Sequence, residues 1–249
     1  MITKMSQGDG AYKVMAILEI LGAADQKSVD GLTVAEVARR LDRDKSVASR
    51  QLKHLADSGL IERDERLRYR LSWRLFAIAA KGGDQRLIQA GIPMLRVLAG
   101  TLHERAHLTV LSGYQVLTVH SEGSSRALEA VGWVGRLTPV WNTSSGIALV
   151  LDRSDEEIEG LLERDQKLSR SQHETVFNSI ARAREEGYSI SDGLFDADVL
   201  GVAAPVRDQN GRIVAAVNIS GPVFRVKPQL HAVASHLMAA ARKLSLLNQ

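Results

Sequence analysis

The sequence predicts an α+β protein that begins with three short helices and a β-hairpin and continues as a mixed α/β domain. Apolar residues recur at helical spacing over the first sixty positions and then alternate as in a strand near residue 70. From about residue 84 onward, runs typical of strands alternate with runs typical of helices. The pair Gly82-Gly83 separates the two patterns and marks the expected domain boundary.

The composition is that of an ordinary globular protein with one large domain or two modest ones. Of its 249 residues, 45% are hydrophobic and 24% are charged. The absence of cysteine excludes disulfide frameworks, thiolate zinc sites, iron–sulfur clusters and cysteine nucleophiles. No apolar run approaches the roughly 18 residues of a membrane span, and Lys13 and Glu19 interrupt any secretory signal. We therefore expect a cytoplasmic protein without a membrane partner.

Three helices are predicted first. The first covers 11–22. The second begins at Thr33, which forms a capping box with Glu36 because each side chain satisfies a free backbone N–H of the first turn. The third covers about 45–58 and ends at Gly59, a residue suited to a helix C-terminus. Their apolar faces are, in order, Val14, Ile17, Leu18 and Leu21; Val34, Val37, Ala38 and Leu41; and Ala48, Leu52 and Leu55.

A hairpin follows the third helix. Leu60-Ile61 leads into the charged turn 63–66, after which Leu67, Tyr69 and Leu71 alternate with arginines. Apolar residues at every second position predict a half-buried strand. Three short helices with a tight second-to-third turn, followed by a two-stranded hairpin, predict a winged helix-turn-helix over residues 1–72.

The second half is expected to contain a connecting helix at 73–81, within a linker over 73–83, and then a larger α/β domain over 84–249. A helix with the stripe Ile92, Leu95, Leu98 and Leu102 opens it. A capping box of Ser171 and Glu174 predicts a helix that ends at Gly187. The runs typical of strands are 107–112, 115–121, 188–191, 199–206 and 212–220, and those typical of helices are 143–151, 154–164, 172–186 and 229–247.

The net positive charge of +3 lies entirely in the first third of the chain. Residues 1–80 hold 14 lysines and arginines against 11 acidic residues, whereas the remainder holds 18 of each. The stretch 39–74 is more basic still, with 11 basic and 6 acidic residues. A localised basic region indicates a polyanion as partner, and the alternative is a solvated surface with a few extra arginines.

The third helix is the strongest functional candidate. Ser46, Ser49, Arg50 and Lys53 lie opposite its apolar face. A recognition helix needs small residues that enter the major groove and a long side chain with two donors, and Arg50 suits O6 and N7 of guanine. The alternative is an ordinary solvated helix face, but the preceding turn, the hairpin and the basic excess favour DNA binding. The expected DNA-binding residues are Lys45, Ser46, Ser49, Arg50, Lys53, His54, Arg66 and Arg68, the last two as wing contacts to phosphate.

Residues 103–107 match the H-E-x-x-H zinc signature, which works only when both histidines lie one turn apart on a continuous helix. Here the helical stripe ends at Leu102, and from His107 the pattern becomes that of a strand. The signature therefore straddles a helix-to-strand junction. We expect neither a metal nor a cofactor, and because no nucleophile elbow, P-loop or dinucleotide motif is present, we expect no catalytic residues.

Two segments of the second half predict a small-molecule site. Ser144, Ser145 and Gly146 open a helix, where hydroxyls and free backbone N–H groups cluster as an anion site. Asn218 and Ser220 place polar groups at the end of an apolar strand face, and converging polar groups are what a ligand pocket requires. The alternative is that the serines only cap the helix and that the other two satisfy loop backbone.

Taken together, these motifs resemble the IclR family of transcriptional regulators over nearly the whole chain. The pattern 33–38, Lys45-Ser46, Arg50 and Leu52 resembles the helix-turn-helix of the family, and Tyr69-Arg70-Leu71 its wing. In the second half, the segments that follow the family pattern in order and spacing are Ser144-Ser145-Gly146, Gly187-Tyr188-Ser189, Val202–Asp208 and Asn218–Pro222.

The resemblance implies a GAF-like effector-binding domain and a homodimer, or a dimer of dimers, on palindromic double-stranded DNA. The ligand positions of the family fall on Ser191 or Asp192, Gly201, Asn218 and Ser220. Two departures favour a larger or more apolar effector: Gly201 stands where the family has a pocket cysteine, and Gly193-Leu194 where it has an acidic pair.

The sequence thus predicts a transcriptional regulator, not an enzyme, whose operator affinity responds to a small organic or aromatic acid. One alternative is an enzyme that acts on a small metabolite and carries an appended DNA-binding domain. A second is an architectural DNA-binding protein without a ligand, which leaves the polar pair on the strand 212–220 unexplained.

Overall fold

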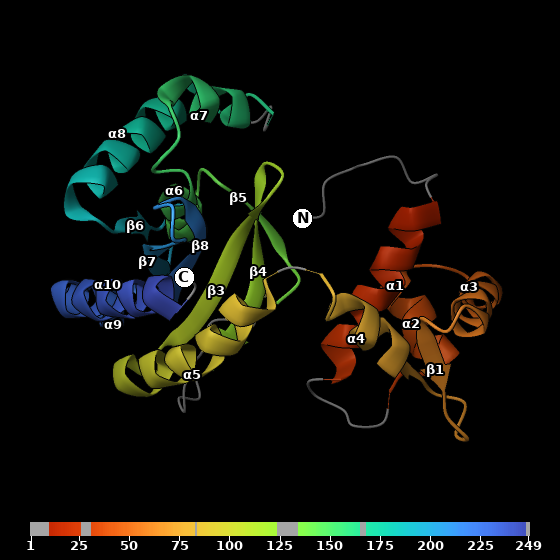
Figure 1. Ribbon diagram of the computed structural model, residues 1–249. Helices are drawn as coiled ribbons and strands as arrows, with labels where there is room; N and C mark the ends of the chain where they lie inside the picture. Colours follow the sequence, from red (N-terminus) through yellow and green to blue (C-terminus); the bar gives the residue numbers. More distant parts are fainter. Residues whose placement is uncertain (1–9, 26–30, 83, 124–133, 165–167, 248–249) are drawn as a thin grey trace. The chain divides into compact units, whose positions relative to one another are not determined.

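A computed structural model describes residues 10–25, 31–82, 84–123, 134–164 and 168–247 (Figure 1). The chain forms two compact units that divide between Gln85 and Arg86. The first consists of helices and a hairpin, and the second of a sheet with helices, which confirms the predicted α+β class.

The first unit contains the three predicted helices, α1 (Gly10–Asp25), α2 (Val34–Leu41) and α3 (Lys45–Asp57), then the hairpin β1 (Ile61–Arg63) and β2 (Tyr69–Leu71), and then α4 (Trp73–Ala79). The capping box that opens α2 is confirmed, since the backbone N–H of Glu36 donates to Oγ1 of Thr33 at 3.3 Å and the carboxylate of Glu36 accepts from the N–H of Thr33 at 2.7 Å. The core of the first unit is formed by Ile17, Leu21, Leu32, Val37, Leu52, Leu55, Ile61 and Tyr69.

The hairpin differs from its prediction at Leu67. This residue was expected on the buried strand face, but it lies in the turn with φ 61° and its side chain is 57% exposed. The turn closes on Asp64, whose carbonyl accepts from the N–H of Leu67 at 3.0 Å and whose side chain accepts from the N–H of Arg68 at 2.8 Å. A turn of this shape requires one left-handed residue, so the strand alternation starts only at Tyr69.

The second unit is built on a six-stranded antiparallel sheet in the order β5-β4-β3-β8-β7-β6 (Figure 1). All strand pairs of this sheet in the described ranges are antiparallel. The short strand β5 was not predicted, and it pairs with β4 through only three residues. The strands are β3 (Arg105–Ser112), β4 (Gln115–Glu122), β5 (Leu137–Pro139), β6 (Ser189–Asp192), β7 (Val199–Arg207) and β8 (Ile213–Pro222).

Helices cover both faces of the sheet. On one face, α5 (Gln85–Leu102) and α10 (Leu230–Leu247) pack against every second residue of β3, β7 and β8. On the other face, α6 (Ser144–Leu149), α7 (Asp155–Leu162) and α8 (Arg170–Glu186) build a second core around Ile147, Ile158 and Ile180. A short segment, α9 (Val223–Val226) and η1 (Lys227–Gln229), joins β8 to α10.

The capping box of α8 is not the one that the sequence predicted. Ser169 caps the helix and Gln172 closes the box, so α8 begins two residues earlier than the predicted start at 172. Ser171 instead accepts a hydrogen bond from Thr175 at its carbonyl, as an ordinary residue of the first turn. The predicted end is confirmed, because Gly187 takes the left-handed conformation with φ 79°.

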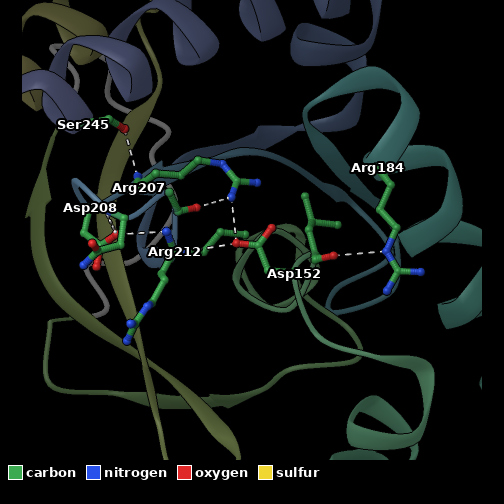
Figure 2. A network of polar contacts seen from close by, with 10 residues as sticks. Asp152, Arg184, Arg207, Asp208, Arg212 and Ser245 are labelled. Carbon is green, nitrogen blue, oxygen red and sulfur yellow. Dashed lines mark hydrogen bonds and ion pairs between the residues drawn. The ribbon is translucent and has the colours of Figure 1, made fainter.

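A polar network holds the loop after α6 to the sheet, at the end of β7 and β8 that lies away from Asn218 and Ser220 (Figure 2). The carboxylate of Asp152 accepts from Arg207 Nη1 at 2.7 Å and from the N–H of Ile213 at 3.2 Å. Arg184 of α8 donates to the carbonyls of Leu151 and Arg153 at 3.1 and 2.7 Å. These contacts fix the position of α6, whose first residues line the site described next.

Candidate effector pocket and DNA-binding surface

The candidate ligand site is a cavity of about 320 Å³ on the sheet face that also carries α6. Along β8 this face changes from Ala216, which is part of the apolar core, to Asn218 and Ser220. The opposite face of the same strand is apolar throughout, because Ala215, Val217 and Ile219 pack under α5 and α10. The cavity is lined by His107, Thr109, Thr118, Thr138, Thr143, Ser144, Ser145, Ser191, Phe195, Asp196, Val199, Gly201, Asn218 and Ser220.

His107 is the most buried titratable group of this cavity, with 3% of its surface exposed. Desolvation, assisted by the charge of nearby Arg105, lowers the pKa of His107 to about 3. The imidazole is therefore neutral at neutral pH. Its Nε2 lies 3.0 Å from Oγ of Ser220, which fixes the ring plane, while Nδ1 is buried and has no hydrogen-bond partner in the described part of the chain.

Asn218 stands directly across from His107 in the register of β3 and β8. Directly opposed residues of an antiparallel pair point to the same face, so both side chains line the same wall of the cavity. Asn218 is 8% exposed, and its Oδ1 is likewise buried without a partner among the described residues. Two residues that line one cavity thus each hold a buried polar atom without a partner among the described residues, a feature that is rare in protein interiors.

The segment that opens α6 contributes two of its three predicted residues to the cavity. Ser144 and Ser145 are buried and line it. Gly146 is not among the lining residues, and its N–H donates to Oγ1 of Thr143 at 3.1 Å. A Cβ atom at Gly146 would collide with the backbone of Val140, so this glycine allows the close approach of α6 to the preceding loop.

Of the ligand positions implied by the family resemblance, Ser191, Gly201, Asn218 and Ser220 line the cavity and Asp192 does not. Asp192 is exposed and accepts from Nζ of Lys227 at 2.8 Å. The close packing around Gly201 explains why glycine stands there, because a Cβ atom would lie 2.7 Å from Oγ of Ser144. Glycine at this position therefore leaves room for a hydroxyl inside the cavity.

Sequence reasoning did not assign several residues of this site. The zinc signature is the only role that the sequence analysis considers for His107, although its alternation with Thr109 on β3 indicates a shared strand face. Thr118 and Thr138 come from β4 and β5, and Phe195 and Asp196 come from the loop between β6 and β7. Nothing local indicates these four, because their place in the site depends on the sheet order.

The outer face of α3 is the candidate DNA-binding surface. Lys45, Ser46, Ser49, Arg50, Lys53 and His54 are all exposed. Ala48, Leu52 and Leu55 are buried on the opposite side, as predicted. In the hairpin, Arg66 is exposed, whereas Nη1 of Arg68 donates to the carbonyl of Gly31 at 2.9 Å and lies 3.7 Å from the carboxylate of Glu36. Arg68 therefore also ties the hairpin to the start of α2.

The predicted junction within the H-E-x-x-H signature is confirmed. Helix α5 ends at Leu102, His103 is left-handed with φ 54°, and β3 begins at Arg105. The two histidines therefore do not share a helix. Glu104, between them, is 2% exposed and forms a two-fold ion pair with Arg225, at 2.5 Å from Nε and 2.8 Å from Nη2.

Within the described residues, no cluster of three or more histidine or acidic side chains has the arrangement of a metal site. No helix there combines the length and the apolar character that crossing a membrane requires.

Comparison with known proteins identifies relatives for both units. The model of the bacterial transcriptional regulator IclR C-terminal domain matches residues 83–246, and a helix-turn-helix domain model matches residues 14–64. The HTH-type transcriptional regulator KdgR of Escherichia coli is 26% identical over 247 residues, covering 96% of this chain and 93% of its own. The Pca regulon regulatory protein of Pseudomonas putida is 28% identical over 202 residues, covering 78% and 69%.

Solved structures of proteins from the same family resemble this chain. An IclR homolog from Microbacterium hydrocarbonoxydans, complexed with 4-hydroxybenzoate, has a TM-score of 0.74 and 25% identity and covers 95% of this chain and 98% of its own. The Thermotoga maritima IclR has a TM-score of 0.70 at 18% identity, covers 96% and 98%, and shares the fold. With the C-terminal model matching well over half of the residues, this chain belongs to the IclR family of bacterial transcriptional regulators.

Proposed function

We propose that α3 reads a DNA operator and that the cavity beside β8 binds the metabolite that modulates operator affinity. The chain is a helix-turn-helix transcriptional regulator with an effector-binding type of C-terminal domain. The residue assignment rests mainly on the cavity of about 320 Å³. Two residues that line it, His107 and Asn218 on adjacent strands, each hold a buried polar atom that has no partner among the described residues. This volume suits a molecule of about one ring.

The proposed DNA contacts combine base reading and backbone binding. Arg50, exposed beside the small Ser46 and Ser49, reads a base edge in the major groove. Lys45, Lys53, His54, Arg66 and Arg68 contact phosphates or flanking base edges. A homodimer or a dimer of dimers would present two such helices to a palindromic operator in the cytoplasm, with 1–72 as the DNA-binding domain, 73–83 as the linker and 84–249 as the effector-binding domain.

The proposed effector is a small organic or aromatic acid or a hydroxylated relative of one. A similar protein was crystallised with 4-hydroxybenzoate, a molecule of this size. Ser144, Ser145, Ser191, Gly201, Asn218 and Ser220 are proposed as the contacting residues, with Gly146 in support. Members of this family are regulators rather than enzymes, and we propose that this chain releases its ligand unchanged. Chemical conversion of that ligand by purified protein would favour an enzyme instead.

The Arg50→Ala variant is expected to lower affinity for the preferred operator by about 1–3 kcal/mol and to relax the base preference at one position of each half-site. The reason is the loss of two donors that recognise a single base edge. The measurement is titration of operator and of random DNA at one fixed salt concentration, with the exposed Arg170→Ala as control. An unchanged ratio between the two DNAs would contradict the assignment of α3.

Separate substitutions of Asn218 and Ser220 by alanine are expected to weaken effector binding and to leave the operator affinity of the ligand-free protein near wild type. A coupling of about 1–3 kcal/mol between effector and operator is typical of such regulators. The measurement is operator titration with and without a metabolite that thermal-shift screening of organic and aromatic acids has identified. Asn178→Ala, at an exposed position of α8, is the control. Effector affinity that survives both pocket substitutions would place the site elsewhere.

A further inference from the structure

The inner wall formed by His107 and Asn218 has a hydrogen-bonding pattern that restricts which chemical group can lie against it. Both residues are more than nine-tenths buried, and both line the cavity. Nδ1 of His107 and Oδ1 of Asn218 have no hydrogen-bond partner within the described ranges. Leaving a buried polar atom without a partner is unfavourable, so a ligand that satisfies both atoms binds more tightly.

The sheet holds the backbones of both residues in place, and a side-chain contact holds the ring of His107, independently of any ligand. His107 and Asn218 are opposed in the β3–β8 register, in the interior of the six-stranded sheet. Ser220, two residues along β8, contacts Nε2 of the ring at 3.0 Å, which leaves Nδ1 as the ring nitrogen without a partner among the described residues. The wall therefore holds two polar atoms on neighbouring strands, and a group that binds both atoms pays little for ordering the backbone.

The chemistry of the pair distinguishes a hydroxyl from a carboxylate. An amide oxygen only accepts hydrogen bonds, and a neutral imidazole nitrogen donates or accepts according to its tautomer. A hydroxyl supplies one donor for Asn218 and remains an acceptor for His107. An ionised carboxylate has no donor, so at this wall it would oppose the amide oxygen and leave it unsatisfied.

The charges of the residues that line the cavity also favour a hydroxyl over a carboxylate at this wall. Among the described residues that line it, Asp196 is the charged one; Arg105, whose charge acts on His107 and which stands opposite Ser220 in the β3–β8 register, does not line it. The depressed pKa of His107 keeps the imidazole neutral, so it supplies no cation either. A carboxylate buried at this wall would therefore have no positive partner among these residues, and burial of an unpaired charge is strongly unfavourable.

We propose that His107 and Asn218 bind a hydroxyl group of the effector, which makes them the residues that select hydroxyl-bearing ligands and that exclude a carboxylate from the inner end of the pocket. This inference rests on the proposed function, because it concerns the same cavity. It adds the class of ligand, a one-ring compound with a free hydroxyl donor, and the orientation in which that ligand binds. A hydroxy acid would place its carboxylate away from this wall.

The test is isothermal titration calorimetry with two hydroxyl compounds and their matched analogues. Phenol is compared with anisole and benzoate, and 4-hydroxybenzoate with 4-methoxybenzoate and terephthalate. At least one hydroxyl compound is expected to bind the wild-type protein about tenfold or more tightly than both of its analogues, since a site built around a hydroxyl rejects a ligand that lacks the donor.

Variants separate hydrogen bonding from shape. Asn218→Leu keeps the approximate volume and is expected to reduce the hydroxyl preference to about threefold or less, because the acceptor is gone. Asn218→Asp keeps an acceptor and is expected to retain the preference, which makes it the informative variant if Asn218→Leu does not fold. Asn178→Ala, on the surface of α8, is the control for unrelated effects.

Four outcomes would overturn the inference: no binding of either hydroxyl compound, equal binding of a methyl ether, tighter binding of benzoate or terephthalate, or an undiminished preference in Asn218→Leu. Titration of operator DNA distinguishes this failure from failure of the proposed function. If a metabolite without a hydroxyl alters operator affinity, the proposed regulatory function holds and the inference of hydroxyl selection is wrong. If hydroxyl compounds bind selectively without any change in operator affinity, hydroxyl selection holds and the proposed regulatory function is wrong.

Discussion

Replacing Arg225 with alanine is expected to destabilise the second unit by about 3–5 kcal/mol, because it leaves a buried carboxylate without its partner. Glu104 is 2% exposed, and both of its oxygens are bound by the guanidinium of Arg225 at 2.5 and 2.8 Å. The same ion pair raises the pKa of Arg225 above its ordinary value. The pair joins the end of α5 to α9, two segments that are 121 residues apart in the chain.

Urea unfolding monitored by circular dichroism measures this loss as a shift of the midpoint at constant slope. Arg182→Ala is a matched control, because Arg182 and Glu186 form an exposed pair on α8 with an N–O distance of 2.7 Å. Exposed pairs contribute at most about 1 kcal/mol, so the control variant should unfold near the wild-type midpoint. Similar midpoints for the Arg225 and Arg182 variants would show that the buried pair contributes no more than a surface pair.

The stability of the protein is expected to fall as the pH decreases from about 6.5 toward 3, and His107 is expected to account for part of that fall. In the unfolded chain this histidine binds a proton near its ordinary pKa of 6.5, whereas burial holds the folded-state pKa at about 3. Between these values the unfolded state binds more protons. The contribution of His107 to stability is therefore complete above pH 6.5 and is lost by about 1.4 kcal/mol per pH unit below it.

The measurement is the free energy of unfolding at a series of pH values for wild type, His107→Gln and Asn178→Ala. The His107→Gln curve should be flatter than the wild-type curve between about pH 6 and 4, whatever its absolute stability, because the titrating group is absent. The Asn178→Ala curve should run parallel to wild type, since no ionisable group is changed. Parallel curves for His107→Gln and wild type would mean that the imidazole has the same pKa in the folded and unfolded states, which contradicts the depressed pKa.

Much of the fold was predictable because its signals are local. The helix starts at Thr33 and Ser154, the tight turn between α2 and α3, and the buried side of α3 depend on residues within one or two turns of each other. Each has its predicted form or boundary. Errors arose where two local signals competed. At α8, Ser169 with Gln172 and Ser171 with Glu174 are both possible capping boxes, and the helix uses the first.

The sequence by itself determined which side of each element is polar: the exposed face of α3 with Arg50, and the alternate positions of β8 that carry Asn218 and Ser220. Periodicity reports the faces of one element and nothing about its neighbours. The tertiary structure alone decided that β8 lies beside β3, more than a hundred residues earlier in the chain. Only this long-range pairing places His107 next to Asn218 and closes the ion pair of Glu104 with Arg225, because strand order is set by the packing of the whole sheet.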